Sequence, residues 1–492
     1  MKSTERLLFD FILFGATGDL ALRKLLPALY RRFTDTGFES KTRVIGVARS
    51  PLSREAYRHL VEESLQTFLR EGEWQQEHWQ TFSQCLHFVS IDAHTIEGYE
   101  NLAQLIASDT TSNERPRVIY LSTASSLYGD ICGHLNDTQL VNVRTRLVLE
   151  KPLGRDLESA QAINAAVAAH FTEKQTYRID HYLGKETVQN LLVLRFANPL
   201  FESLWNHHYI DHIQITIAES LGVEGRISFY EETGALRDIV QNHLLQLLCI
   251  VAMEPPPNID PDRIRDEKLK VLRSLRPIYP GSLGKHVVRG QYRAGKINNE
   301  PVCGYLDEEG MPPASNTETF VALKVMIDNM RWAGIPFYLR TGKRLPERLC
   351  QIVVQFKEIS HSIFQTSTQP VLSNKLVIDL QPDESITLRL CGKRFGPGME
   401  IRTMDLNLNP GARSNRKPVD AYERLIVDVV HGDQTLFLRQ DELEQAWEWV
   451  KPILTEWEKS TAPPEEYSAG SWGPSAATLL LAKDGKLWHE GS

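Results

Sequence analysis

The sequence has few cysteines and none of the close pairs that cysteine chemistry requires. No two of the six stand in a CxxC arrangement, which argues against a metal or redox motif of that kind. We interpret them as buried thiols of a protein in a reducing compartment, and we expect no metal ion. The six are Cys85, Cys132, Cys249, Cys303, Cys350 and Cys391.

Long apolar runs and an excess of basic residues are also lacking. An apolar run near the N-terminus covers only about eight residues, whereas a membrane span needs roughly 18, and a glycine-rich turn interrupts it. The net charge of −8 argues against a nucleic-acid partner, which a basic surface would favour. The sequence therefore predicts a cytoplasmic protein that has no membrane segment and binds no nucleic acid.

The first part of the chain alternates short apolar runs with stretches of helical spacing. This alternation is typical of βαβ units and a parallel sheet. We predict a Rossmann-like α/β domain over residues 1–185. The expected strands lie within residues 8–16, 43–48, 86–92, 117–123 and 146–152, and the expected helices within 19–33, 53–70, 98–108 and 127–136.

The second part, residues 186–492, has longer strand-like runs, several with alternating apolar and polar residues. We predict a larger α+β domain with a mostly antiparallel sheet and helices on one side of it. The tail from residue 461 is rich in Pro, Gly and Ser, so we expect it to be irregular and to run over the surface. The expected strands lie within residues 212–220, 319–327, 351–358, 375–382 and 386–392, and the helices within 234–253, 420–430 and 440–458.

A glycine motif follows the first predicted strand and opens a helix. Glycines there allow a tight turn and a close approach of the backbone to a pyrophosphate, which then lies at the positive end of the helix. The spacing is GxxGxxA instead of GxGxxG, and an ordinary strand–turn–helix remains the alternative. The predicted cofactor-binding residues are Gly15, Ala16, Thr17, Gly18, Asp19, Leu20 and Ala21.

The end of the second predicted strand indicates which dinucleotide binds. An acidic residue there would suit the ribose 2′-hydroxyl of NAD, but the chain has Arg49 and Ser50. A guanidinium can bind the 2′-phosphate of NADP with two hydrogen bonds, so NADP is favoured over a merely solvated arginine. Lys151 follows another strand and should point into the ligand crevice.

Two polar clusters indicate a site for an anionic, hydroxylated substrate. Residues 178–186 (RIDHYLGKE) combine cations and donors for a phosphate with an aspartate that can orient a histidine. The alternative is a solvated interdomain linker. Further on, His243 and Gln246 lie three residues apart on an expected helix, and a buried core histidine remains an equally good interpretation.

These motifs, in this order, resemble the glucose-6-phosphate dehydrogenase family. The resemblance extends over GATGDLA, EKPLG, RIDHYLGKE, EGR, RDIVQNHLLQ, RDEKLKVL, GQY, NTETFVAL, PFYLRTGK and DAYERLI, from residue 15 to about residue 426. It implies a Rossmann domain followed by a larger β+α domain. It also implies oxidation of glucose 6-phosphate at C1 to 6-phosphoglucono-lactone, with hydride transfer to NADP⁺, in a homodimer or homotetramer.

The resemblance also implies a role for individual residues. His243 would be the general base and Asp180 would orient its imidazole. The 6-phosphate would bind to His181, Tyr182 and Lys185, and the sugar hydroxyls to Glu219 and Asp238. Lys151 would lie between cofactor and sugar, and Lys343 and Arg348 would extend from the second domain.

The chain departs from the family pattern at two places. Many members have a Pro-Pro pair where residues 122–126 of this chain read STASS. We therefore expect the part of the site that borders the nicotinamide to differ in detail from the family pattern, with no change in the activity. Residues 349–353 (LCQIV) lack the basic residues of a second, structural NADP site, so we predict that this site is absent or altered. Two rival functions stay open: a dehydrogenase of another hexose or hexose phosphate, and an inactive NADP-binding regulator.

Overall fold

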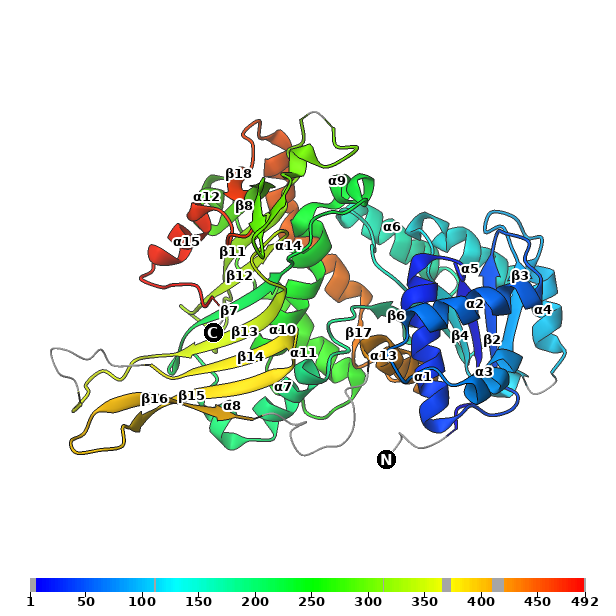
Figure 1. Ribbon diagram of the computed structural model, residues 1–492, viewed down its shortest axis with the longest axis horizontal. Coiled ribbons are helices and arrows are strands. Elements are labelled where there is room, and N and C mark those ends of the chain that lie inside the picture. Colours follow the sequence, from blue (N-terminus) through cyan, green and yellow to red (C-terminus); the bar gives the residue numbers. More distant parts are fainter. Residues whose placement is uncertain (1–5, 110–111, 313, 365–372, 409–419, 491–492) are drawn as a thin grey trace. The chain divides into compact units, whose positions relative to one another are not determined.

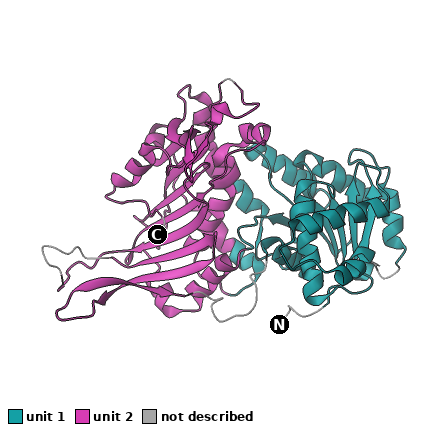
Figure 2. Ribbon diagram, viewed as in Figure 1, with its two compact units in different colours: residues 1–184, 258–265, 419–444 teal, residues 185–257, 266–418, 445–492 magenta. Residues whose placement is uncertain are grey.

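The computed structural model describes residues 6–109, 112–312, 314–364, 373–408 and 420–490, which form two compact units (Figure 2). Unit 1 comprises Met1–Gly184, Asn258–Arg265 and Val419–Glu444, and unit 2 comprises Lys185–Pro257, Asp266–Pro418 and Gln445–Ser492. Two later segments of the chain thus return to unit 1. No compositional change in the sequence signals that return.

Unit 1 is built around a sheet of seven strands (Figure 1). Six are parallel, in the order β6-β5-β4-β1-β2-β3 that is typical of dinucleotide-binding folds, and β17 pairs antiparallel with β6 at the edge. Every residue of β1 and β4 is buried, which explains their continuous apolar sequences. The strands are β1 (Asp10–Phe14), β2 (Arg43–Ala48), β3 (Leu86–Ser90), β4 (Arg117–Leu121), β5 (Thr145–Leu149), β6 (Thr176–Ile179) and β17 (Phe437–Leu438).

The helices of unit 1 confirm the four predicted ones and add others. Ser53 accepts a hydrogen bond from the N–H of Ala56 and so caps α2, and Asp156 caps α6 in the same way. The first predicted helix begins with a π-helical turn, η1 (Ala21–Leu25), before α1. The helices are α1 (Leu26–Thr36), α2 (Arg54–Phe68), α3 (Gln76–Phe82), α4 (Tyr99–Ala107), α5 (Tyr128–Asp137), α6 (Leu157–Ala168) and α13 (Ala421–His431).

Unit 2 contains a nine-stranded sheet in the order β16-β15-β14-β13-β7-β12-β11-β8-β18. Only β7 with β12 and β8 with β18 are parallel, so the prediction of a mostly antiparallel sheet is confirmed. The strands are β7 (Ile210–Ala218), β8 (Val287–Arg293), β11 (Phe320–Met326), β12 (Pro336–Gly342), β13 (Leu349–Phe356), β14 (Lys375–Gln381), β15 (Ser385–Lys393), β16 (Ile401–Asn407) and β18 (Glu465–Ser468).

Unit 2 has more helices than the sequence patterns predicted. The stretch 234–253 is helical as expected, but most of its first half is the π-helix η6 (Leu236–Leu244), which continues as α10 (Leu245–Ala252). The other helices are α7 (Glu186–Phe196), α8 (Pro199–Leu204), α9 (Ile227–Ala235), α12 (Leu283–His286) and α15 (Ser475–Ala482). Two more, α11 (Pro261–Arg273) and α14 (Gln440–Lys459), begin in unit 1 and end in unit 2. Among the described residues, no helix is long and apolar enough to cross a membrane.

The expectation of an irregular surface tail after residue 461 is wrong. The tail adds β18 to the sheet and forms α15, whose Leu480 and Leu481 pack with Phe320, Ala322 and Tyr338 of the sheet. The apolar residues that follow its Pro- and Gly-rich start explain this packing. The π-helix η6 also contacts this sheet, at β7, β11 and β12.

Candidate functional site

The turn after β1 can be formed only with glycine at its first position. Gly15 has a φ of +77°, and a Cβ placed on it would lie 2.1 Å from the carbonyl oxygen of Ser122. The N–H groups of Gly15 and Ala16 donate to the carbonyl of Val47 at 2.9 and 3.1 Å, and Gly18 donates to Gly15. The turn is therefore packed between the ends of β2 and β4, and a side chain does not fit at its first position.

The remaining residues of the glycine motif differ in their exposure. Ala16 and Ala21 are buried, Thr17 and Leu20 are half-buried, and Gly18 is exposed. The Asp19 side chain is exposed and pairs with Arg23 at 3.3 Å. Arg49 is exposed directly after β2, and its carbonyl accepts a hydrogen bond from the hydroxyl of Ser90, the last residue of β3.

The residues after β5 combine a buried acid with a lysine. The Tyr120 hydroxyl on β4 donates to the Glu150 carboxylate, and the Tyr128 hydroxyl donates to the Glu150 carbonyl at 3.0 Å. Burial raises the pKa of Glu150 to about 7, although Tyr120 and Lys151 act in the opposite direction. Lys151 follows half-buried, and its peptide bond to Pro152 is cis.

The residues after β6 form a compact cluster with α13. Asp180 is buried and accepts a hydrogen bond from the N–H of Tyr182 at 2.9 Å. The His181 ring lies 4.8 Å from the Tyr182 ring and stacks on Tyr422 of α13, with centroids 6.1 Å apart. A Cβ on Gly184 would approach the Ala421 carbonyl to 3.0 Å, so the run packs tightly against the start of α13.

Tyr422 is a residue of this cluster to which the sequence analysis assigned no role. It follows Asp420, whose carboxylate accepts the Tyr422 N–H and caps α13. Burial raises the pKa of Tyr422, and the charges of Glu150, Asp420 and Asp180 raise it further. The sequence signal that could have indicated Tyr422 was an aromatic residue in the first turn of a helix capped by an aspartate.

In unit 2, two of the predicted substrate-binding cations, Lys185 and Arg348, converge on one amide. Lys185 Nζ donates to the Leu380 carbonyl at 3.1 Å. When the Gln381 amide is oriented so that its oxygen faces the cations, that oxygen accepts from Lys185 at 2.7 Å and from Arg348 at 3.3 Å. The sequence analysis missed Gln381, which lies at the end of β14 and holds both side chains.

A second group of unit 2 lies where β7 and β12 end side by side. Lys343 donates to the Glu219 carboxylate at 2.7 Å, and its Nζ lies 5.0 Å from the centroid of the Tyr230 ring. Burial raises the pKa of Tyr230 well above its ordinary value, and the nearby charge of Asp238 contributes to the rise. Glu219, Asp238 and Lys343 thus all lie around one tyrosine, as a polar, hydroxylated ligand would require.

His243 lies in the last turn of the π-helix η6, and the residue is only 1% exposed. Its N–H donates to the Asn242 side chain at 2.6 Å. Gln241 Nε2 and Gln246 Oε1 are buried nearby in the chain and have no hydrogen-bond partner among the described residues. Buried polar atoms of this kind usually meet water or a ligand, and π-helical turns often occur at functional sites.

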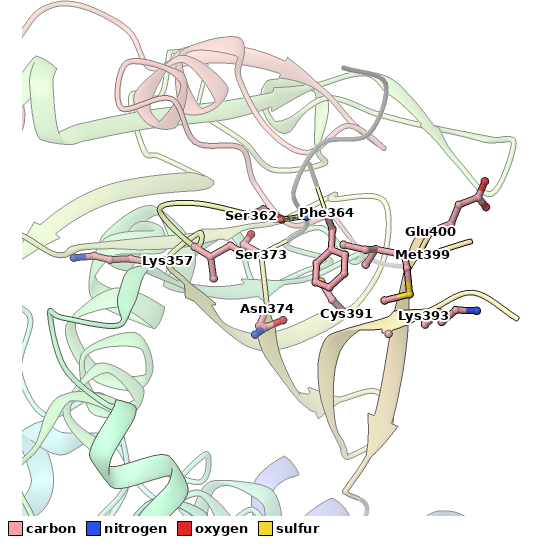
Figure 3. Close-up of a pocket in the computed structure, with 12 residues that line it drawn as sticks. Lys357, Ser362, Phe364, Ser373, Asn374, Cys391, Lys393, Met399 and Glu400 are labelled. Atoms are coloured by element: carbon pink, nitrogen blue, oxygen red, sulfur yellow. Dashed lines mark hydrogen bonds between the residues drawn. The ribbon is translucent and has the colours of Figure 1, made fainter. Parts of the chain in front are cut away.

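A pocket of about 340 Å³ lies at the end of the β15–β16 hairpin (Figure 3), and none of the residues predicted from the sequence lines it. Its lining is mainly apolar and includes Phe364 and Met399. Its two lysines already donate to carbonyls at 2.7 Å, Lys357 to His207 and Lys393 to Gly396. We assign no function to this pocket.

Two family models together match almost the whole chain. The model described as "Glucose-6-phosphate dehydrogenase, NAD binding domain" matches residues 12–190, and the one for the C-terminal domain matches residues 192–489. Glucose-6-phosphate 1-dehydrogenases from Rhizobium meliloti (strain 1021) and Mycolicibacterium smegmatis (strain ATCC 700084 / mc(2)155) are each 48% identical over 484 residues. These alignments cover 98% of this chain and 98% of each relative.

Solved structures agree with this result. A glucose-6-phosphate dehydrogenase in complex with its substrate glucose-6-phosphate has a TM-score of 0.90 at 34% identity, covering 100% of both chains. The glucose-6-phosphate 1-dehydrogenase from Mycobacterium avium has a TM-score of 0.83 at 33% identity, covering 99% of both chains.

Replacement of Gly15 tests the turn after β1. We expect Gly15→Ala to weaken NADP⁺ binding by at least about tenfold, because both the positive φ and the Ser122 carbonyl oppose a methyl group. Gly72→Ala is the matched control, since Gly72 has a φ of +81° with nothing within 4 Å of its Cβ position. Calorimetric titration of both variants with NADP⁺ measures the difference, and equal affinities would contradict the assignment of this turn.

Proposed function

This chain belongs to the glucose-6-phosphate dehydrogenase family of oxidoreductases, and we propose the residues through which it performs that family's reaction. The reaction is the oxidation of glucose 6-phosphate at C1 to 6-phospho-glucono-1,5-lactone, the first step of the oxidative pentose phosphate pathway. The observation that carries the proposal is the match of two family models over nearly all the chain.

The cofactor is NADP, and the residues at the carboxyl ends of β1 and β2 suit it. The glycine turn of residues 15–21 would hold the pyrophosphate, and the exposed Arg49 would bind the 2′-phosphate. Bound NADP⁺ supplies the acceptor for the hydride that leaves C1. Calorimetric titration of Arg49→Ala with NADP⁺ tests the role of the arginine. We expect weaker binding, and an unchanged affinity for NADP⁺ would contradict this role.

The proton chemistry is assigned to His243 and Asp180. His243 would remove the proton of the C1 hydroxyl as the C1–H bond breaks, and Asp180 would hold the imidazole in the right tautomer and stabilise its charged form. Three features support this assignment: both side chains are buried, Asp180 is held by the Tyr182 N–H, and unpartnered amides flank His243 in the chain.

The sugar phosphate would bind through the groups described in each unit. His181 and Tyr182 of unit 1 and Lys185 and Arg348 of unit 2 supply donors and positive charge for the phosphate. Glu219 and Asp238 would accept hydrogen bonds from the sugar hydroxyls. Lys343 would extend towards the sugar from the second domain, and Lys151 would lie between the sugar and the cofactor. A neutral sugar would leave the phosphate-binding cations desolvated without compensation, which disfavours the rival hexose dehydrogenase.

We also propose a domain boundary between residues 185 and 186 and a location in the cytoplasm. The boundary is supported by the family models, which meet between residues 190 and 192. The location is supported by the cysteines, none of which is joined by a disulfide. The prediction that all six are buried is wrong, because Cys303 and Cys391 are exposed and Cys85 is half-buried.

The base is tested by replacing His243. We expect His243→Asn to reduce kcat by about 10²–10⁴-fold, because a positioned base supplies about that much of the rate. NADPH formation with glucose 6-phosphate, followed by its absorbance, measures the effect. His208→Asn, an exposed histidine of unit 2, is the matched control and should retain activity. Undiminished turnover by His243→Asn would overturn the mechanism. If the wild type showed no turnover, the rival function, an inactive NADP-binding regulator, would be favoured instead.

The phosphate assignment is tested by replacing Lys185. We expect Lys185→Ala to raise KM for glucose 6-phosphate about 10–100-fold, because the variant loses one charge-assisted hydrogen bond to the phosphate. The KM for glucose, which has no phosphate, should change far less. Lys270→Ala, which removes a mostly exposed lysine of α11, is the control. Equal effects on the two substrates would place Lys185 outside the phosphate site.

We further propose a homodimer or homotetramer formed through the sheet of unit 2. One face of the β15–β16 hairpin is apolar, with Leu388 opposite Leu406 and Leu390 opposite Met404, and Met404 and Leu406 are exposed. On the other face, Arg389 pairs with Asp405. We expect Leu406→Glu to produce monomers in sedimentation velocity, while Thr403→Glu on the polar face keeps the oligomer. A monomeric wild type would contradict the proposal.

A further inference from the structure

A buried carboxyl group stands directly before Lys151, and no role has yet been given to it. Glu150 is 7% exposed, and Tyr120 on the neighbouring strand β4 donates its hydroxyl to the carboxylate. A second tyrosine, Tyr128, donates to the Glu150 carbonyl at 3.0 Å. One phenol therefore anchors the side chain and another the backbone, so the Glu150 charge has a defined position at the end of β5.

The surroundings of Glu150 place its ionisation in the neutral pH range. Burial raises its pKa to about 7, and the nearby carboxylate of Asp180 adds to the rise. The Tyr120 hydrogen bond and the charge of Lys151 lower it. Glu150 can therefore change its ionisation within the pH range of an enzyme assay. The titratable groups that face it are Tyr120 of β4, Tyr128 of α5, Lys151, Asp180 after β6 and Tyr422 of α13.

The two forms of Glu150 act differently on their neighbours. The carboxylate attracts the ammonium group of the adjacent Lys151 and repels the Asp180 carboxylate, whereas the neutral acid does neither. Since the carboxylate is anchored by Tyr120, the attraction has a defined direction. A merely structural carboxyl would be served equally well in either form, because both can accept the hydrogen bond of Tyr120.

We propose that Glu150, anchored by Tyr120, is a positioning residue whose ionised form holds Lys151 in place for the reacting sugar and cofactor. The proposal rests on the role given above to Lys151. It makes the enzyme more active when Glu150 is ionised. The rate constant kcat/KM should therefore contain a contribution that rises through neutral pH and depends on this one carboxyl group.

The experiment compares kcat/KM of the wild type and Glu150→Gln from pH 6 to pH 8.5. An amide resembles the neutral acid in shape but cannot ionise. We expect the wild type to exceed the variant by about twofold at pH 6 and by about tenfold at pH 8.5. Ionisation of the substrate phosphate affects both enzymes and cancels in the ratio. A ratio that stays constant with pH would show a structural role only and overturn the proposal.

Tyr120→Phe provides a second measurement with a different prediction. Loss of the hydroxyl raises the pKa of Glu150, so the rise of kcat/KM should move up by about one pH unit. The variant should be most impaired near pH 7 and approach the wild type at pH 9. Tyr57→Phe is the matched control, because Tyr57 is a fully buried tyrosine of unit 1 whose hydroxyl has no partner among the described residues.

The control should stay within about twofold of the wild type at every pH. A uniform loss in Tyr120→Phe, parallel to the wild-type profile, would contradict the proposal even if Glu150→Gln failed to fold. Failure of the proposed function would be seen separately, as undiminished turnover by His243→Asn, whatever the Glu150 ratio shows.

Discussion

Parallel pairing across the centre of unit 1 places the ends of four strands at one edge of the sheet. Phe14 of β1 pairs with Leu121 of β4, Leu121 with Leu149 of β5, and Leu149 with Arg178 of β6. The residues that follow these strands must therefore lie close to that edge: Gly15, Ser122, Glu150 with Lys151, and Asp180. A shift of register by one residue would move each of these groups to the wrong side of its strand. The apolar side chains that bury the strands thus also position the polar groups.

Unit 2 uses a local exception to its antiparallel sheet for the same purpose. β7 and β12 are parallel neighbours, with Ala218 opposite Gly342, so the residues after both strands lie together. This pairing accounts for the contact between Glu219 and Lys343. The Lys185 and Arg348 pair has another origin, since both side chains meet at Gln381, where β14 ends. Two separate strand ends therefore provide the two polar groups of this unit.

Local patterns were enough to predict the strands and helices with strong periodicity, and the glycine motif. They were not enough where tertiary contacts decide. The Pro- and Gly-rich start of the tail gave no sign that Tyr467 is buried in β18, which joins β8, or that Leu481 of α15 is buried in the core cluster of the sheet. The roles of Gln381 and Tyr422 depend on segments far apart in the chain, Gln381 on Lys185 and Tyr422 on His181. The π-helical geometry around His243 had no signal in the spacing of apolar residues, which resembles an ordinary helix.

Two buried carboxyl groups of unit 1, Asp10 and Glu150, differ in the groups that compensate their charge. Asp10 is fully buried and is matched by two guanidinium groups, Arg43 at 2.8 Å and Arg115 at 2.9 Å, which is typical of a structural ion network. Glu150 is anchored instead by a phenol, which costs less to bury than a guanidinium but compensates the negative charge only in part. A carboxyl needed only for structure would be better served by the first arrangement. The second leaves burial to raise the pKa of Glu150, and the charge of Lys151 acts against that rise, so this carboxyl is coupled to a residue of the proposed site.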